Sequence, residues 1–168
     1  DLNGEYWGIQ NIREKVNEHF LSSHHDIPSE HIDLLDIQGI YSENIVHGTN
    51  IDYLNLLDYL ENNDIEDSSV QSGIEGWIDI NSFMQYQAFQ IFIDNRDWPG
   101  NNIKFWRDHR TSGKWRWILY DTDFGFAGQW WSEWDQNYAY FFDTLDFVLS
   151  GNQTTWANSP WATLFIRK

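Results

Sequence analysis

Residues 94–125 read DNRDWPGNNIKFWRDHRTSGKWRWILYDTDFG, and this stretch decides how the rest of the chain is interpreted. Apolar and aromatic residues over 103–107 and 114–120 predict two strands, and the turn-forming residues 111–113 predict a hairpin between them. A loop dense in Asp and Asn precedes the hairpin, and a second acidic loop follows it. Because a hairpin returns the chain to the same edge, we expect the two loops to meet in space.

The two loops carry oxygen ligands in a pattern that suits a metal ion. The first loop has Asp97 and, five residues later, Asn102, and the second has Asp121 and Asp123. We expect Asp121 and Asp123 to lie on an extended segment, where residues two apart point to one face. Carboxylate and amide oxygens together suit a hard cation such as Mg²⁺. Acidic, Asn-rich loops are most often solvated turns, but their order around one hairpin favours a site.

The spacing of the first loop matches a known catalytic arrangement. Protein kinases use H-R-D-x-x-x-x-N, in which Asp acts at the substrate hydroxyl and Asn binds metal, followed by a D-F-G motif. Here Arg96, Asp97 and Asn102 keep that spacing, and Asn95 stands in place of His. Phosphoryl transfer needs a base at the nucleophile and a cation on the phosphates, and the two loops offer residues for both.

Three segments resemble the CotH family of spore-coat proteins: NGEYWGIQNIREKV (3–16), DWPGNNIKFWR (97–107) and GKWRWILYDTDFGF (113–126). Members of that family are atypical protein kinases that are secreted or surface-associated. The resemblance implies Mg²⁺ or Mn²⁺ and ATP as cofactors and Ser or Thr of an extracytoplasmic protein as the acceptor. It also implies a secreted, cell-surface or spore-coat location.

The resemblance also implies a role for each site residue. Asp97 falls on the proposed catalytic Asp, and Asn102 falls on a metal or phosphate ligand. The family's closing motif is similar to W-D-x-D-x-x-F-G, and it aligns with YDTDFGFA (120–127), where Tyr120 replaces Trp and Ala127 replaces Gly. This alignment places the principal metal ligand at Asp121 and a second acid at Asp123, whereas the D-F-G pattern alone would choose Asp123. Glu14 matches an acidic position that would orient a basic residue contacting the nucleotide.

The expected fold class is α+β and protein-kinase-like, consisting mostly of the C-terminal lobe with a remnant of the N-terminal lobe. We divide the chain into the end of the small lobe (1–21), a variable insert (22–78) and the metal and catalytic core (79–168). No Gly-rich loop is present, and Arg13 and Lys15 are expected on a helix surface, away from phosphates. The chain starts without Met and stops within an apparent helix that begins at 159–160, so we expect a piece of a longer protein.

Hydrophobic periodicity predicts the remaining elements. The sequence predicts strands at 5–11 and 31–37, and helices at 12–22, 50–61, 79–92 and 138–149. It predicts loops at 22–31, 39–48 and 62–76, the last with room for one turn of helix.

Composition excludes several classes of protein. The 168 residues include 10 Lys and Arg against 26 Asp and Glu, a net charge of −16. That charge argues against sequence-independent nucleic-acid binding and against docking on anionic lipid. Cysteine is absent, which excludes disulfides and thiolate metal sites. No apolar run approaches the roughly 18 residues of a membrane span.

Two other interpretations remain open at this point. Acidic loops near Trp130 and Trp131 also suit a non-catalytic Ca²⁺-dependent carbohydrate-binding or adhesion domain, with glycans as partners. The other is a scaffold domain that keeps the site residues but lacks the nucleotide lobe. A zinc site at His24, His25 and His31 is disfavoured, because no cysteine or helical H-x-x-x-H accompanies them.

Overall fold

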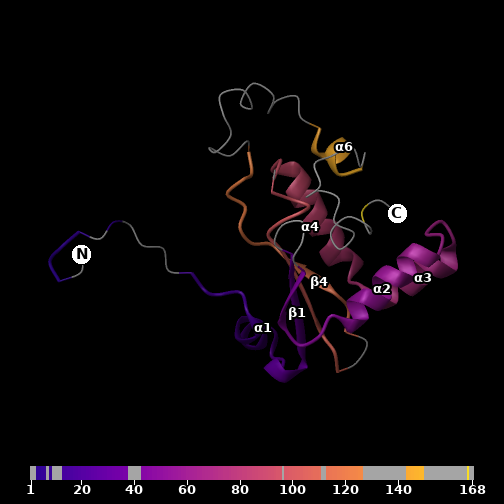
Figure 1. Cartoon of the computed structure of the whole chain (residues 1–168), viewed down its shortest axis with the longest axis horizontal. Coiled ribbons are helices and arrows are strands. Elements are labelled where there is room, and N and C mark those ends of the chain that lie inside the picture. Colours follow the sequence, from indigo (N-terminus) through magenta and orange to yellow (C-terminus); the bar gives the residue numbers. More distant parts are fainter. Residues whose placement is uncertain are drawn as a thin grey trace.

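The structure is a computed structural model that describes residues 3–6, 8, 13–37, 43–95, 97–110, 113–126, 143–149 and 166. Two pairs of consecutive strands, separated by three consecutive helices, form one sheet with helices beside it (Figure 1). The elements are α1 (Glu18–His25), η1 (Ser29–His31), β1 (Ile32–Ile37), β2 (Glu43–His47), α2 (Ile51–Asn62), α3 (Ser68–Trp77), α4 (Ile80–Phe92), β3 (Ile103–Asp108), β4 (Arg116–Ile118) and α6 (Thr144–Leu149).

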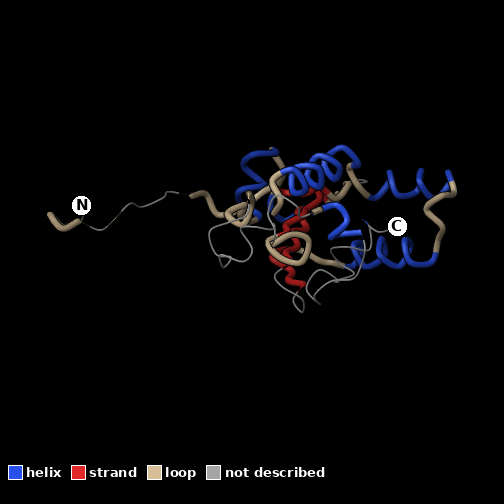
Figure 2. Tube along the Cα trace, turned by 90° about the horizontal axis from the view of Figure 1, so that it is seen from above, coloured by secondary structure: helices blue, strands red, loops and turns tan. Residues whose placement is uncertain are grey.

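The strands form one antiparallel sheet in the order β2-β1-β3-β4. The predicted hairpin is confirmed, since Phe105 pairs with Trp117 and Trp106 with Arg116. Helices surround the sheet, and α2 and α3 extend from one side of it (Figure 2). The mixed helix and antiparallel-sheet architecture confirms the α+β class.

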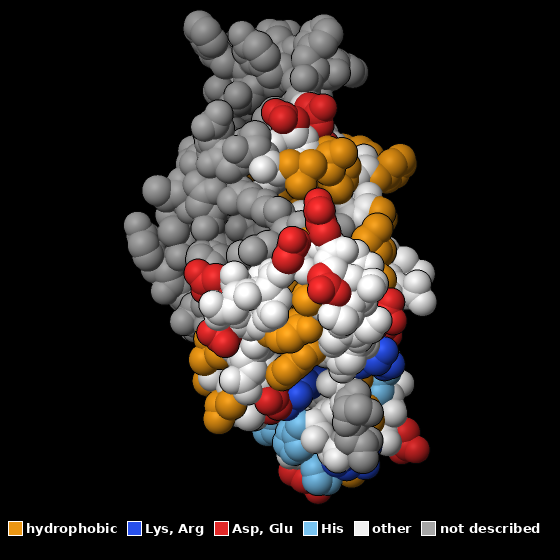
Figure 3. All heavy atoms as spheres, turned by 90° about the vertical axis from the view of Figure 1, so that its right-hand side faces the viewer, with side chains coloured by type: hydrophobic (Ala, Val, Ile, Leu, Met, Phe, Trp, Pro, Cys, Tyr) orange, Lys and Arg blue, Asp and Glu red, His pale blue; other side chains and the backbone are white. Residues whose placement is uncertain are grey.

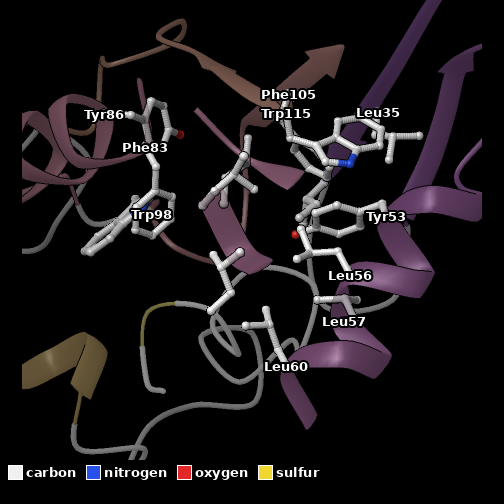
Figure 4. Close-up of a cluster of buried hydrophobic side chains, with 14 of the residues drawn as sticks. Leu35, Tyr53, Leu56, Leu57, Leu60, Phe83, Tyr86, Trp98, Phe105 and Trp115 are labelled. Atoms are coloured by element: carbon white, nitrogen blue, oxygen red, sulfur yellow. The ribbon is translucent and has the colours of Figure 1, made fainter. Parts of the chain in front are cut away.

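The sheet is covered on both faces, which explains why all six residues of β1 are buried. On one face, Leu35 and Ile37 belong to a large cluster with residues of α2, α3 and α4. Figure 4 shows Phe105, Trp115, Leu35 and Tyr53 gathered in this cluster. On the other face, Ile32 and Leu34 pack with Leu21 of α1 and Trp106 of β3. Alternate residues of a strand point to opposite faces, so a strand between two clusters has no exposed side.

Several predicted boundaries are wrong, each for a local reason. The helix predicted at 12–22 begins at Glu18, because the Asn17 side chain accepts a hydrogen bond from the Phe20 N–H and caps α1. It runs to His25, so the predicted loop 22–31 is shorter and also contains η1. The strand predicted at 114–120 is reduced to β4. The predicted helix 138–149 is described only from α6 onward.

Two predicted loops contain regular elements. The predicted loop 39–48 contains β2, which forms only because it pairs with β1. The predicted loop 62–76 contains α3, which is capped by Asp67 and buries Val70 and Ile74 against the core. Most residues of the predicted strand 5–11 lie outside the described ones. The same holds for the predicted helix that begins at 159–160, of which Ile166 is described and packs against the large cluster.

Our first stability prediction concerns the start of α4, where Asp79 accepts a hydrogen bond from the Ser82 N–H at 3.0 Å. Asp79→Ala should lower the free energy of unfolding by about 1 kcal/mol, as loss of an N-cap does. The exposed ion pair of Asp79 with Arg116 should add little to this loss. Urea unfolding measures the change. Asp79→Asn is the matched control, because Asn also caps helices, and equal losses in both variants would contradict the explanation.

Candidate active site

The first loop is fixed by a buried residue at the position where kinases have His. Asn95 is 2 % exposed, and its Nδ2 donates to Oε1 of Gln90 at 2.8 Å. Its Oδ1 accepts a hydrogen bond from the Asp97 N–H at 3.1 Å. Asn95 therefore links α4 to the backbone of Asp97.

A second anchor comes from Trp98, which is 1 % exposed and belongs to the large cluster. Its Nε1 donates to Oε1 of Gln87 on α4 at 3.0 Å, and Figure 4 shows its ring beside Phe83. The residue directly after Asp97 is thus held by the core, so the position of Asp97 is set by packing.

Asp97 itself is half-buried, and two neighbouring amides orient its carboxylate. Its Oδ2 accepts from Nδ2 of Asn101 at 2.9 Å and from Nδ2 of Asn102 at 2.5 Å. Both bonds use one oxygen, so Oδ1 remains available for another donor. Asn102 has a φ of 53°, in the left-handed region that Asn tolerates better than most residues. Sequence reasoning missed Asn101, which the kinase spacing does not mark.

The second loop is folded back rather than extended. Asp121 has a φ of 50°, and the Gly125 N–H bonds to the carbonyl of Thr122 at 3.0 Å to close a turn. The Phe126 N–H then donates to the carbonyl of Ile93, at the end of α4. The expectation of an extended 121–123 segment is wrong. The bond to Ile93 nevertheless brings the second loop to the end of α4, from which the first loop starts.

Electrostatics place three carboxylates near one another. Burial raises the pKa of Asp97, and the charge of Asp123 raises it further, while the hydrogen bonds from Asn101 and Asn102 oppose this rise. Partial burial also raises the pKa of Asp121, followed by the charge of Asp123, a hydrogen bond between the two side chains and the charge of Asp97. Like charges that share a site favour proton retention. A bound cation would reduce the repulsion among these carboxylates.

The donor set fits a hard divalent cation. Asp121 and Asp123 lie close enough for Asp123 to raise the pKa of Asp121, and both contribute carboxylate oxygens. Asn102 turns its Nδ2 towards Asp97, and its amide oxygen is a neutral ligand of the same kind. Among the described residues, no three acidic or histidine side chains form a ready metal site. Mg²⁺ is usually held by one or two carboxylates with substrate phosphates and water, and these residues match that type of ligation.

A pocket of about 630 Å³ adjoins this cluster, lined by Arg13, Glu14, Lys15, Val16, Lys104, Tyr120 and Asp121. The expectation that Arg13 and Lys15 lie on a helix surface is wrong, because α1 starts after them. Glu14 also lies here, with Oε2 at 3.6 Å from Nε2 of His24. Glu14 and Asp121 therefore line the same pocket, although the two residues are far apart in the sequence.

Lys104 belongs to a polar network on the floor of this pocket. Its Nζ lies 2.8 Å from Oδ2 of Asp36 on β1 and 4.5 Å from the centre of the Tyr120 ring. The Tyr120 hydroxyl donates to Oδ1 of Asp36 at 3.2 Å. Sequence reasoning missed Lys104 and Asp36, because Asp36 is 68 residues away and only the β1–β3 pairing brings them together.

The bonds to Asp97 lead to a prediction about pH. The Asn101 hydrogen bond lowers the pKa of Asp97 because it stabilises the anion. Asn101→Ala should therefore raise that pKa and move the acidic limb of the kcat/KM profile to higher pH. The profile of the variant measures this shift, and Asn101→Ser, which keeps a donor, is the control. A profile that stays in place, or moves to lower pH, would contradict this role of Asn101.

Comparison with known proteins identifies the family of the chain. A family model described as CotH kinase protein matches residues 1–168, the whole chain. Searches of curated proteins and of solved structures each found no match.

In the described part of the chain, no helix has the length and apolar character needed to cross a membrane. The predicted residues Arg96, Trp130 and Trp131 lie outside the described ones. On the match over its full length, the chain belongs to the CotH kinase protein family.

Proposed function

We propose that this chain is the catalytic part of a CotH-type protein kinase, which transfers the γ-phosphoryl group of ATP to Ser or Thr of an extracytoplasmic protein. One observation supports this most strongly. Three of the 10 Lys and Arg in a chain of net charge −16 line one pocket, and Asp121 lines it with them. Concentrated positive charge beside a carboxylate pair suits a polyphosphate carrying a divalent cation.

The charge of the rest of the molecule strengthens this argument. Acidic side chains are spread over the face in Figure 3, and the few Lys and Arg there lie on its lower part. A protein of this charge repels a free polyphosphate unless cations gather locally. Arg13 and Lys15 supply such cations, together with Lys104, which also pairs with Asp36. A pocket of about 630 Å³ lies within the size range of small-molecule sites.

The residue roles follow from chemistry at the two loops. Oδ1 of Asp97 accepts the proton of the acceptor hydroxyl as that oxygen bonds to the γ-phosphorus. The bond from the γ-phosphorus to the bridging oxygen breaks, and ADP leaves with that oxygen. Asp121, Asp123 and the oxygen of Asn102 would hold Mg²⁺ or Mn²⁺. When bound, the ion neutralises charge that develops on the phosphates.

Other residues would have supporting roles. Glu14 would orient Arg13 or Lys15 towards the phosphates, as an acidic residue does for the kinase lysine. We also propose that 1–21 ends a small lobe, that 22–78 is a variable part and that 79–168 is the catalytic core. Family membership supports a secreted, cell-surface or spore-coat location and a protein substrate.

The test of this proposal is transfer of the labelled γ-phosphoryl group of ATP to a protein by the full-length protein with Mg²⁺ or Mn²⁺.

Within that assay, Lys104→Met should raise the KM for ATP about tenfold, the loss expected when one charge-assisted bond of about 1.4 kcal/mol is removed. Lys114→Met is the matched control, because Lys114 is exposed and does not line the pocket. Melting temperatures of both variants separate a binding defect from unfolding of the Asp36 site.

Two results would contradict the proposal. One is an absence of transfer together with an absence of ATP binding by the full-length protein. The other is Ca²⁺-dependent glycan binding without nucleotide affinity, which would favour the carbohydrate-binding interpretation.

A further inference from the structure

Where the structure describes the chain, the outer edge of β4 is hydrogen-bonded to other elements near its start but not at Leu119, beyond its end. β4 is the last strand of the sheet in the described residues. Near its start, the Trp115 N–H donates to the carbonyl of Trp77, and the Trp115 carbonyl accepts from the Asp79 N–H. Two residues on, the Trp117 N–H donates to Oγ of Ser82 at 3.0 Å. The N–H and carbonyl of Trp115 and the N–H of Trp117 therefore face away from β3 and are bonded by the end of α3 and the start of α4.

Leu119 is one residue beyond the end of β4 and has the same parity as Trp115 and Trp117, so in a strand continued by pairing its backbone groups would face the same outer edge. Within the described part of the chain, neither its N–H nor its carbonyl makes a hydrogen bond. Its side chain is 46 % exposed. An open backbone position at the edge of a sheet is a template for pairing with another extended chain.

A pocket of about 520 Å³ lies against this edge, between β4 and α4. Trp117, Leu119, Tyr86 and Phe89 form its apolar walls, and Asn81 and Gln85 are among its polar ones. Phe89 is 39 % exposed. The pocket thus combines apolar surface for a side chain with amides and open backbone groups for a main chain.

The pocket also leads towards the candidate active site. Leu119 is two residues before Asp121, at most about 7 Å along an extended chain. On the opposite wall, Phe89 lies one helical turn before Ile93, whose carbonyl holds the second loop through Phe126. A chain paired with Leu119 would need only two or three further residues to reach the carboxylates.

We infer that this pocket binds the acceptor protein as an extended segment, which pairs with the backbone of Leu119 and places an apolar side chain against Phe89 and Trp117. This rests on the proposed function, since it identifies how the acceptor hydroxyl reaches Asp97. Strand addition gains affinity from main-chain hydrogen bonds and specificity from pockets for alternate side chains, and both features are present here.

A glycan fits the same pocket less well. Sugars stack on an open aromatic face, but Trp117 is stacked against Phe105 at 5.8 Å and meets the Phe83 ring edge-on at 5.0 Å. Its ring is therefore largely engaged by the core. Open backbone groups on a strand edge favour a polypeptide.

The test uses a degenerate nonapeptide library with a central Ser, apolar residues at alternate positions and Lys between them, labelled with fluorescein. Lys keeps the peptides soluble and complements the charge of −16. Fluorescence anisotropy with the full-length protein measures binding without any need for transfer. A second library carries N-methyl groups at alternate amides, which removes main-chain donors and keeps every side chain.

We expect N-methylation to weaken binding at least tenfold, and Leu119→Pro, which removes the outward N–H, to weaken binding of the unmethylated library similarly. Phe89→Ala tests the apolar wall independently of the backbone and should also weaken binding. Met84→Ala is the control, because Met84 is exposed on α4 but does not line the pocket. With an active enzyme, Leu119→Pro should raise the KM for peptide and leave the KM for ATP unchanged.

The outcomes separate the two proposals. Equal binding of both libraries, or binding unaffected by both pocket variants, overturns the docking site even if transfer is observed. Pocket-dependent peptide binding without any transfer supports the docking site and counts against the kinase proposal. Binding of cellohexaose or chitohexaose that Phe89→Ala abolishes, without peptide binding, overturns the inference in favour of a glycan.

Discussion

Asp97→Asn is expected to reduce phosphoryl transfer by about 10²–10⁴-fold, the usual contribution of a general base. The amide oxygen of Asn can still accept from Asn101 and Asn102, so the loop should keep its shape. The variant loses the negative oxygen that would take the proton of the acceptor hydroxyl. We therefore expect kcat to fall while the affinity for Mn²⁺ changes little, because Asp121 and Asp123 remain.

The measurement pairs steady-state transfer with a Mn²⁺ titration of the melting temperature in the same protein sample. Asp108→Asn is the matched control, since Asp108 bonds to Arg110 on the surface and is not part of either loop. A variant that keeps wild-type kcat, or that loses Mn²⁺ binding together with activity, would require another role for Asp97.

The sequence predicted the hairpin and α4 well, because their signals are local. The Asp79 cap and the regular apolar spacing of 80–92 are properties of a single helix. The turn between β3 and β4 was likewise marked by its own residues. These two elements position both acidic loops, so the relation of the loops could be expected before any coordinates.

The missed elements depend on partners distant in the sequence. β2 is polar at its start and has no clear alternation, and it becomes a strand because the edge of β1 is open to it. α3 contains two glycines and three serines, residues that favour loops. Burial of Val70 and Ile74 outweighs that preference, so tertiary packing, rather than propensity, decides both elements.

The candidate site also contains residues that local spacing could predict and residues that depend on distant partners. Asp97, Asn102, Asp121 and Asp123 were selected by spacing, and the structure brings the three acids within electrostatic reach of one another. Their roles as base and metal ligands remain predictions. No spacing rule could select Lys104, because its partner Asp36 belongs to β1, a strand in the segment that was expected to vary.

Asp121→Asn is expected to abolish most of the stabilisation that Mg²⁺ or Mn²⁺ gives to the protein. A metal at 100 times its dissociation constant stabilises the folded state by about 2.7 kcal/mol, or about 5–10 °C in melting temperature for a chain of this size. The variant replaces a charged ligand by a neutral one and relieves the repulsion from Asp123. Without metal it should therefore melt at the wild-type temperature or slightly above.

The pH dependence of the metal effect gives this prediction a second, independent readout. Burial and the neighbouring acids raise the pKa of Asp121, and a metal must displace the proton that the raised pKa retains. Metal affinity of the wild type should therefore fall as the pH drops through that raised pKa, and the part of the dependence due to Asp121 should be absent from the variant. Asp58→Asn, an exposed change on α2, should behave as the wild type. An equal melting shift in wild type and Asp121→Asn, with the same dependence on pH, would place the metal elsewhere, since a cation held by Asp121 must respond to the charge of that side chain.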